Sequence, residues 1–312
     1  MPNGLLLIDK PEGVRSTDCV ARVRRAFGRG TRVGDAGTLD STASGLLVVL
    51  VGSATRLSDY VMRLPKVYRA SVRLGAETDT CDRTGEVVFR GDAACVNEAA
   101  LDRILPSFWG MRMQRPPEIS ALKVNGEPSH RLARSGRGGA LPERPVMMES
   151  VRRRSPLADG CVEIEVVCGR GTYIRSLARD IGSRLGCGAH VEALRRLSVG
   201  PFRVSEALSD LSALASAPLR SPREAVAPFH RILLTERAEA RILNGLPVPL
   251  REAGRYVPGT VGLAGGLCVE GAGMIGFADR EVGEKEAGER GGGEILLRPR
   301  ANISVRDEAE GT

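Results

Sequence analysis

The chain has 312 residues, of which 42% are apolar and 27% are charged, a composition typical of soluble globular proteins and not of disordered or fibrous ones. This length allows one large domain or two ordinary ones, with a sizeable core. No stretch approaches the roughly 18 uninterrupted apolar residues of a membrane span, and the N-terminus has neither a basic leader nor a cleavage pattern. We therefore expect a cytoplasmic protein.

The net charge of +7 is distributed unevenly. Residues 270–312 contain ten acidic and six basic residues, a net of −4, which leaves +11 on residues 1–269. A basic body suits a polyanionic partner such as nucleic acid. A general arginine bias is the alternative, because 41 of the 45 basic residues are arginines. The four lysines stand out against that bias, since a compact ammonium is not equivalent to a planar guanidinium; they are Lys10, Lys66, Lys123 and Lys285.

The cysteines and histidines do not form a metal or disulfide pattern. There are seven cysteines and three histidines, the cysteine number is odd, and no CxxC pair is present. These spacings favour neither a zinc site nor a disulfide framework. We expect most of the cysteines to be reduced and buried.

In chain order, the first half predicts alternating strands and helices. Residues 4–8 are typical of a buried strand, and a helix follows that Ser16 or Thr17 can cap. The glycine-punctuated segment 32–40 is expected to be irregular. Residues 46–51 form an aliphatic run of strand length, residues 57–64 suggest a helix, and residues 68–74 alternate as a half-buried strand does.

The second half contains the clearest helix, over residues 172–185, with Gly186 placed to end it. Residues 162–166 alternate as a strand, and residues 135–145 are expected to form a flexible loop. Short aliphatic segments separated by glycines predict a small β-domain over residues 229–304, followed by a tail at 305–312. Within that region, residues 281–294 are expected to be disordered. The pattern indicates an α+β or mixed α/β class.

One loop carries a candidate catalytic carboxylate. Residues 34–40 read GDAGTLD, and Gly34 and Gly37 permit backbone conformations that other residues resist. Asp40, held on such a loop beside a buried strand, could be a nucleophile or a general base. It could equally cap a turn or a helix, as Asp, Ser and Thr commonly do. The spacing matches neither a Walker loop nor a dinucleotide-binding fingerprint.

Six motifs in register resemble those of the TruB family of pseudouridine synthases. Residues 34–40 are similar to the family's catalytic loop, G-H-x-G-[TA]-L-D, and residues 171–175 (GTYIR) match another family motif. The remaining four are LLLIDKPEG at residues 5–13, KVY at 66–68, QRPPEISALKVNG at 114–126, and the segment 186–196. The resemblance spans about residues 4 to 205.

The resemblance implies an α+β pseudouridine synthase fold, with a central mixed, mainly antiparallel sheet flanked by helices and loops. The catalytic domain would cover residues 1–228, and residues 229–304 would form a PUA-like RNA-binding domain. Such enzymes convert a uridine of tRNA, typically uridine-55 in the T loop, to its C-glycoside isomer. They need no metal or cofactor. We expect tRNA, through its T stem-loop, as the partner, and a monomer by default.

The resemblance also assigns roles to individual residues. Asp40 would be the catalytic carboxylate, which attacks the base, attacks the sugar or abstracts the sugar's 2′ proton. Tyr68 would stack on a flipped uracil, and Arg175 would pair with Asp40. Further residues are expected at the substrate site: Tyr173, Leu194 as an apolar wall, Lys10 through its charge, and Asp35. Arg195, Arg196 and other arginines would contact phosphates.

The catalytic loop departs from the family pattern at two positions. Asp35 stands where the family usually has histidine, and a carboxylate repels nearby phosphates. Ser41 replaces the usual proline, so we expect a less rigid loop. These departures are the support for one alternative, a tRNA-binding or tRNA-folding protein that has lost catalysis. A guide-RNA-dependent relative of the dyskerin type is a second alternative, and the start of the motifs at Gly4 argues against it.

Overall fold

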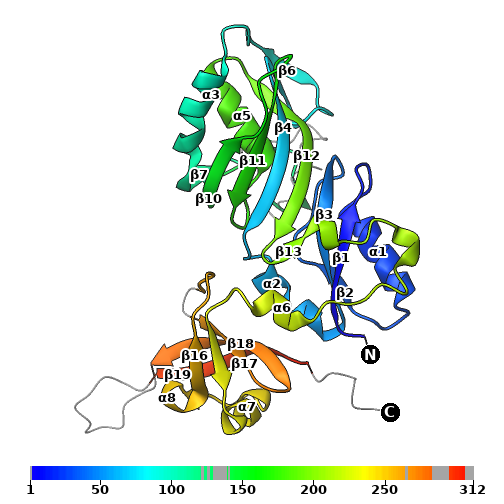
Figure 1. Cartoon of the computed structure of the whole chain (residues 1–312), viewed down its shortest axis with the longest axis vertical. Helices are drawn as coiled ribbons and strands as arrows, with labels where there is room; N and C mark the ends of the chain where they lie inside the picture. Colours follow the sequence, from blue (N-terminus) through cyan, green and yellow to red (C-terminus); the bar gives the residue numbers. More distant parts are fainter. Residues whose placement is uncertain are drawn as a thin grey trace, which may run out of the picture.

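The computed structural model describes residues 2–120, 123–124, 127–128, 139, 141–263, 266–282 and 295–305. Within these ranges the chain forms a large sheet and a smaller one, joined by short helices and turns (Figure 1). No helix in the described ranges is both long enough and apolar enough to cross a membrane.

The large sheet has nine strands and is mainly antiparallel. Its main path runs β1-β3-β12-β4-β11-β10-β7, with β2 paired to β3 and β13 paired to β12. The neighbours β3 and β12 are parallel, and every other pair is antiparallel. The strands are β1 Gly4–Lys10, β2 Val33–Asp35, β3 Ala43–Val51, β4 Lys66–Leu74, β7 Gly110–Gln114, β10 Arg144–Arg153, β11 Cys161–Cys168, β12 Ala189–Val199 and β13 Phe202–Arg203. This confirms the expected mixed sheet.

Helices and short turns connect these strands. The helices are α1 Ser16–Ala26, α2 Ser58–Val61, α3 Glu98–Ile104, α5 Ile174–Leu185 and α6 Pro222–Val226. Short 3-10 segments lie at η1 Gly52–Leu57, η2 Leu105–Phe108, η3 Val204–Glu206 and η4 Leu211–Ala213. Two small hairpins pair β5 Ala76–Thr78 with β6 Val87–Arg90 and β8 Lys123–Val124 with β9 Glu127–Pro128. Helix α5 ends where predicted, because Gly186 adopts a left-handed φ of 74°.

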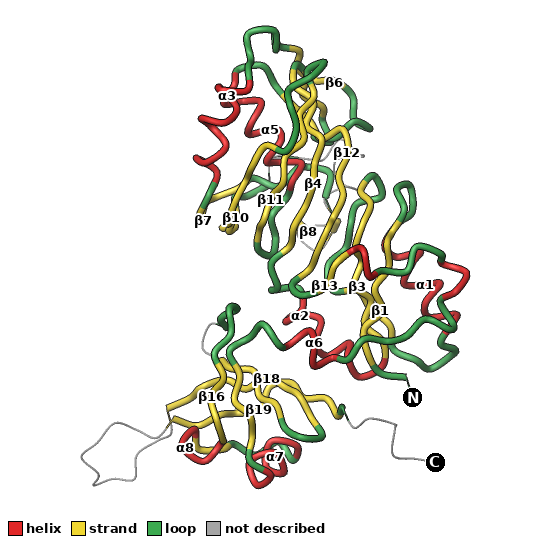
Figure 2. Tube along the Cα trace, viewed as in Figure 1, coloured by secondary structure: helices red, strands yellow, loops and turns green. Residues whose placement is uncertain are grey.

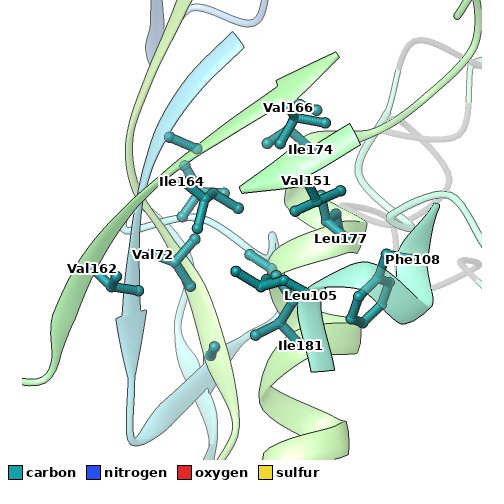
Figure 3. Close-up of a cluster of buried hydrophobic side chains, with 14 of the residues drawn as sticks. Val72, Leu105, Phe108, Val151, Val162, Ile164, Val166, Ile174, Leu177 and Ile181 are labelled. Atoms are coloured by element: carbon teal, nitrogen blue, oxygen red, sulfur yellow. The ribbon is translucent and has the colours of Figure 1, made fainter. Parts of the chain in front are cut away.

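The largest core lies between the sheet and helices α3 and α5, which cover the same face (Figure 1). Ile174, Leu177 and Ile181 form one apolar stripe along α5 and pack on the inward residues of β4, β10 and β11 (Figure 3). The apolar residues that repeat every three or four positions along α5 and those that alternate along the strands thus pack together in one cluster. Helix α1 packs in the same way on β1 and β3, in a separate cluster.

The second sheet has six strands in the order β15-β19-β18-β17-β14-β16. Its strands β16, β18 and β19 are labelled in Figure 2, where helices α7 and α8 lie at the same end of the molecule. Its elements are β14 Arg231–Leu234, α7 Glu236–Leu243, β15 Val248–Pro249, α8 Leu250–Ala253, β16 Gly254–Val257, β17 Gly266–Glu270, β18 Met274–Val282 and β19 Ile295–Ser304. The ring of Tyr60 on α2 stacks on that of Phe277 on β18, with centroids 3.4 Å apart. Apolar residues of both sheets therefore share one buried cluster.

Several local expectations differ from the structure. Segment 32–40 is not wholly irregular, because Val33–Asp35 pairs with Val49–Val51 as strand β2. The helix expected over residues 57–64 is only one turn, α2, preceded by the 3-10 turn η1. The expected loop 135–145 ends in strand β10, and residues 135–138 and 140 lie outside the described residues. Residues 283–294 and 306–312 also lie outside them, whereas Glu281 and Val282 belong to β18.

Candidate active site

A cavity of about 310 Å³ opens beside the loop that carries Asp40. Residues from four parts of the chain line it: the loop before β3, the turn before β4 with the start of that strand, the segment from β11 into the first turn of α5, and β12. They are Gly37, Thr38, Leu39, Asp40, Met62, Lys66, Tyr68, Gly169, Arg170, Gly171, Thr172, Tyr173, Ile174, Arg175, Leu194 and Arg196. Four of the six motifs thus converge on one cavity.

The backbone around Asp40 is held from two sides. The Ser16 hydroxyl at the start of α1 donates to Leu39 O and accepts from Leu39 N, both at 2.9 Å. Gly13 N donates to Ser41 O at 2.8 Å. These bonds fix the residues before and after Asp40, while its own side chain remains 45% exposed. The carboxylate is therefore presented to the cavity from a rigid loop, and it does not itself cap a helix.

Arg175 forms the ion pair with Asp40 that the resemblance implied. Its Nε lies 2.9 Å from Asp40 Oδ2, and its side chain is only 6% exposed. The other guanidinium nitrogens donate to Thr80 O at 2.8 Å and to Ile119 O at 3.1 Å. Because α5 begins at Ile174, Arg175 projects from the first turn of a helix that the core holds firmly. The guanidinium thus orients the carboxylate.

A second carboxylate near Arg175 carried no signal in the sequence. Asp82 Oδ2 lies 3.9 Å from Arg175 Nε, and the Asp82 side chain is 8% exposed. It accepts hydrogen bonds from the hydroxyls of Thr80 at 2.9 Å and Thr84 at 2.6 Å. The buried Arg175 therefore lies between two acids, one facing the cavity and one behind it.

Both tyrosines of the motifs line the cavity. Tyr68 lies on β4, opposite Arg196 of β12, and burial raises the pKa of its hydroxyl. Tyr173 precedes α5, and Gln114 binds both of its main-chain groups, accepting from Tyr173 N at 2.9 Å and donating to Tyr173 O at 3.0 Å. Burial also raises the pKa of Tyr173. Leu194 lines the cavity as well.

Arg196 was expected to contact phosphates, and that expectation is wrong. Its side chain is buried, with Nε donating to Leu46 O and Nη2 to Gly37 O, both at 2.7 Å. Nη1 lies 3.5 Å from the Tyr68 hydroxyl. Strands β3 and β12 come close enough for these bonds because Gly45 has no side chain; a Cβ there would lie 2.3 Å from Arg196 O.

Lys66 is a second buried cation at the cavity. It begins β4, and its Nζ donates to Met62 O and, at 2.7 Å, to Leu64 O. Burial, together with the nearby Arg196, lowers the pKa of Lys66 to about 8. The ammonium therefore fixes the turn between α2 and β4 while it lines the cavity.

Two of the predicted site residues do not line the cavity. Lys10 is buried behind the loop, donating to Pro11 O at 3.0 Å and Val14 O at 2.6 Å, and burial lowers its pKa. The Asp35 carboxylate accepts from the Thr38 hydroxyl at 3.1 Å and so braces the turn before Asp40. Arg195 forms a two-bond ion pair with Asp9, at 3.0 and 2.6 Å.

His190 and five of the cysteines are buried and do not line the cavity. His190 is buried, with Nδ1 2.9 Å from Ala76 O. All seven cysteines are free, and five of them are buried. In the described part of the chain, no group of three His, Cys, Asp or Glu side chains is arranged to hold a metal ion.

Comparison with known proteins places this chain in a family. Residues 24–174 match the model of the TruB family pseudouridylate synthase N-terminal domain, and residues 175–234 match that of the tRNA pseudouridylate synthase B C-terminal domain. The proteins named tRNA pseudouridine synthase B from Geobacter sulfurreducens and Thermobifida fusca are 42% and 43% identical to it. These matches cover 83% and 78% of this chain, and 86% of each relative.

Solved structures agree with the fold. The structure titled "Crystal Structure of a Cbf5-Nop10-Gar1 Complex" superposes with a TM-score of 0.71 at 23% identity, covering 96% of this chain and 84% of the other. At that identity the likeness concerns the fold alone. The two family models and the relatives that are more than 40% identical show that the chain belongs to the TruB family of pseudouridine synthases.

Proposed function

We propose that this chain converts a uridine of tRNA to pseudouridine, at position 55 in the T loop, with Asp40 as the catalytic carboxylate. The names of its relatives support tRNA as the substrate. The observation that carries the assignment of Asp40 is its ion pair with the buried Arg175 at the cavity. Among the described residues, Asp40 is the one acid that lines this cavity.

The cavity suits a single extruded base. A uridine in a folded loop must leave its stack before a side chain can reach the glycosidic bond. A volume of about 310 Å³ is at the small end of ligand pockets, which is appropriate for one nucleoside. Tyr68 supplies an aromatic face, and stacking of this kind contributes about 1–3 kcal/mol per base. Leu194 and Tyr173 complete the wall in this proposal.

Lys10 and Asp35 act indirectly in the proposal. Lys10 lies behind the catalytic loop and interacts with Asp40 through charge rather than contact. Asp35, at the base of the turn that Thr38 closes, adds a negative charge close to where the RNA backbone would pass. It would weaken or retune docking of the tRNA while leaving the reaction intact.

The second sheet would provide a further RNA contact. We divide the chain into a catalytic domain at residues 1–228 and a PUA-like domain at residues 229–304, which would contact the acceptor end of tRNA. The acidic character of residues 270–312, with ten acidic and six basic residues, implies that this contact depends little on phosphates.

The test uses an unmodified tRNA transcript. The protein is incubated with it, pseudouridine is mapped at nucleotide resolution, and the reaction is repeated with Asp40→Asn. We expect product at position 55 from the wild type and none from the variant. Tight binding by the wild type without product would favour the tRNA-binding alternative. Product formed by Asp40→Asn would overturn the assignment of the carboxylate.

A further inference from the structure

Two cations are buried at the cavity without an acid beside them. Lys66 is 6% exposed and Arg196 is 1% exposed, and both line the cavity. Both donate to main-chain carbonyls. Among the residues that the structure describes, no carboxylate oxygen lies within 4.0 Å of either side chain. Burying an unpaired cation costs free energy, which points to a role at this position.

The charges that line the cavity do not balance. Asp40 is already paired with Arg175. Arg170 lies 3.6 Å from Asp59 and is half exposed. Asp82 lies behind Arg175 and does not line the cavity, so among the described lining side chains no acid offsets the two positive charges of Lys66 and Arg196. A site of this kind favours a ligand on which negative charge is present or develops.

Both cations keep donors free for such a ligand. An ammonium has three N–H groups and a guanidinium five. Lys66 makes two hydrogen bonds, to Met62 O and Leu64 O, and Arg196 makes three. Within the described part of the chain, this leaves one N–H of Lys66 and two of Arg196 without a partner.

The position of the two cations decides which part of an RNA they would meet. Both are buried next to Tyr68: Lys66 lies two residues earlier on β4, and Arg196 pairs with Tyr68 across the strands. Phosphates remain on the backbone of an RNA, outside a cavity that admits one base. The group that reaches Lys66 and Arg196 is therefore the base that lies against Tyr68.

We propose that Lys66 and Arg196 stabilise the negative charge that collects on the uracil ring when its bond to the sugar breaks. This inference rests on the proposed function. When the C1′–N1 bond breaks, its electron pair stays on the base. After the base rotates, a pair on C5 forms the bond to C1′, C5 loses its proton, and N1 gains one. Whichever way Asp40 acts, negative charge is transiently located on the ring, and preorganised cations lower the barrier.

The ionisation of Lys66 supplies a readout that a purely structural role lacks. Its pKa of about 8 reflects burial first, then Arg196 on β12; Cys168 on β11 and Arg170 after β11 also face it. Below pH 8 the ammonium is charged, and above it the charge is lost. The rate of bond cleavage should therefore fall as the pH rises through about 8.

The experiment measures single-turnover pseudouridine formation and tRNA affinity from pH 6.5 to 9.5. The variants are Lys66→Met, Arg196→Met and the charge-retaining Arg196→Lys. Arg112→Met is the matched control, because Arg112 is also partly buried and donates to a main-chain carbonyl, Ser107 O, but lies on β7 and does not line the cavity. Thermal unfolding of each variant is recorded at the same pH values.

We expect both Met variants to bind tRNA within about twofold of the wild type but to react about a hundredfold more slowly, the loss typical of removing one charge-stabilising donor. Arg196→Lys should recover most of the rate, Arg112→Met should match the wild type, and Lys66→Met should lose the fall in rate near pH 8. Met variants that react at the wild-type rate, or that lose affinity alone, would overturn the inference.

The inference and the proposed function fail in different ways. A wild type that forms no pseudouridine refutes the proposed function. An active wild type whose rate stays level across pH 8 refutes the role of Lys66, and this holds even if a Met variant does not fold. Recovery by Arg196→Lys in turn distinguishes the charge of Arg196 from the shape of its side chain.

Discussion

Replacing Arg175 with methionine should destabilise the protein far more than replacing its partner Asp40 with asparagine. Arg175 is 6% exposed, and four groups depend on it: the carboxylates of Asp40 and Asp82, and the carbonyls of Thr80 and Ile119. Methionine fills much of the volume but donates no hydrogen bond. Of these four groups, Asp82 and the two carbonyls lie within the protein. Water therefore cannot replace the hydrogen bonds or the charge that they lose, and their desolvation penalty remains.

The magnitude follows from burial. Removing one partner of a buried charged network costs about 3–5 kcal/mol. Asp40 is 45% exposed, and a half-exposed ion pair contributes about 0–1 kcal/mol, so Asp40→Asn should cost no more than that. The asymmetry between the two partners, rather than either value alone, is the prediction. It arises because the buried Arg175 holds several parts of the fold together, whereas Asp40 faces the cavity.

Urea unfolding followed by circular dichroism measures both free energies. Arg179→Met is the matched control, one turn further along α5. Arg179 is 20% exposed at its side chain, is paired with Asp180 and donates to Arg115 O, so its loss should cost about 1–2 kcal/mol. An Arg175→Met variant that unfolds within 1 kcal/mol of the wild type would refute the role assigned to the buried network. So would an Asp40→Asn variant that loses as much stability as Arg175→Met.

Three further perturbations test other parts of the structure. Asp35→His should tighten tRNA binding by about threefold to tenfold at 0.1 M salt, with the single-turnover rate little changed, because a negative charge near the RNA is removed; unchanged affinity in a titration would contradict this. Gly45→Ala should cost at least about 2 kcal/mol in chemical denaturation, since Gly45 has φ 101° and a Cβ would lie 2.3 Å from Arg196 O. Gly34→Ala, with open space at its Cβ, is its control and should be tolerated. When the pH rises from 7 to 10, the free energy of unfolding of the wild type should increase by about 2–3 kcal/mol relative to that of Lys66→Met. The reason is that the pKa of Lys66 in the folded state, about 8, lies below its unfolded value, so the cost of burying its charge disappears as it loses its proton. If the difference in unfolding free energy between Lys66→Met and the wild type did not change with pH, Lys66 would not be buried as a cation.

The parts of the fold with strong periodicity could be predicted from sequence. Helix α5 has an apolar stripe every three or four residues and a glycine after its last turn, and the structure begins it within two residues of the expected start. Strand β2 could not be predicted, because its three residues follow no alternation and pair only through the longer strand β3. Tertiary pairing, rather than propensity, creates that strand.

The site was predictable where a motif fixed the residue and not where burial fixed its role. The pairing of Arg175 with Asp40 followed from the resemblance. Arg196 ends the motif at residues 186–196, but its buried role could not be predicted, because its burial depends on the approach of β3 to β12. The proximity of Asp82 to Arg175 could be recognised only from the folded structure.

The rare lysines were informative for a physical reason. Lys10 and Lys66 are both buried, and each places one compact ammonium between two main-chain carbonyls. A planar guanidinium has a different shape and spreads its donors over a wider fork. In a chain that uses arginine almost throughout, lysine remains at these two positions, where a small cation fills a small polar space. The side chain of Lys123 lies outside the described residues.

The most direct test of the central claim is the release of the C5 proton of the target uridine. A tRNA transcript labelled with tritium at uridine C5 is mixed with excess protein, and tritium in water is measured together with the affinity for tRNA. The wild type should release one equivalent per tRNA, while Asp40→Asn should bind with similar affinity and release none. A wild type that binds and releases no tritium, or an Asp40→Asn variant that releases it at the wild-type rate, would contradict the account.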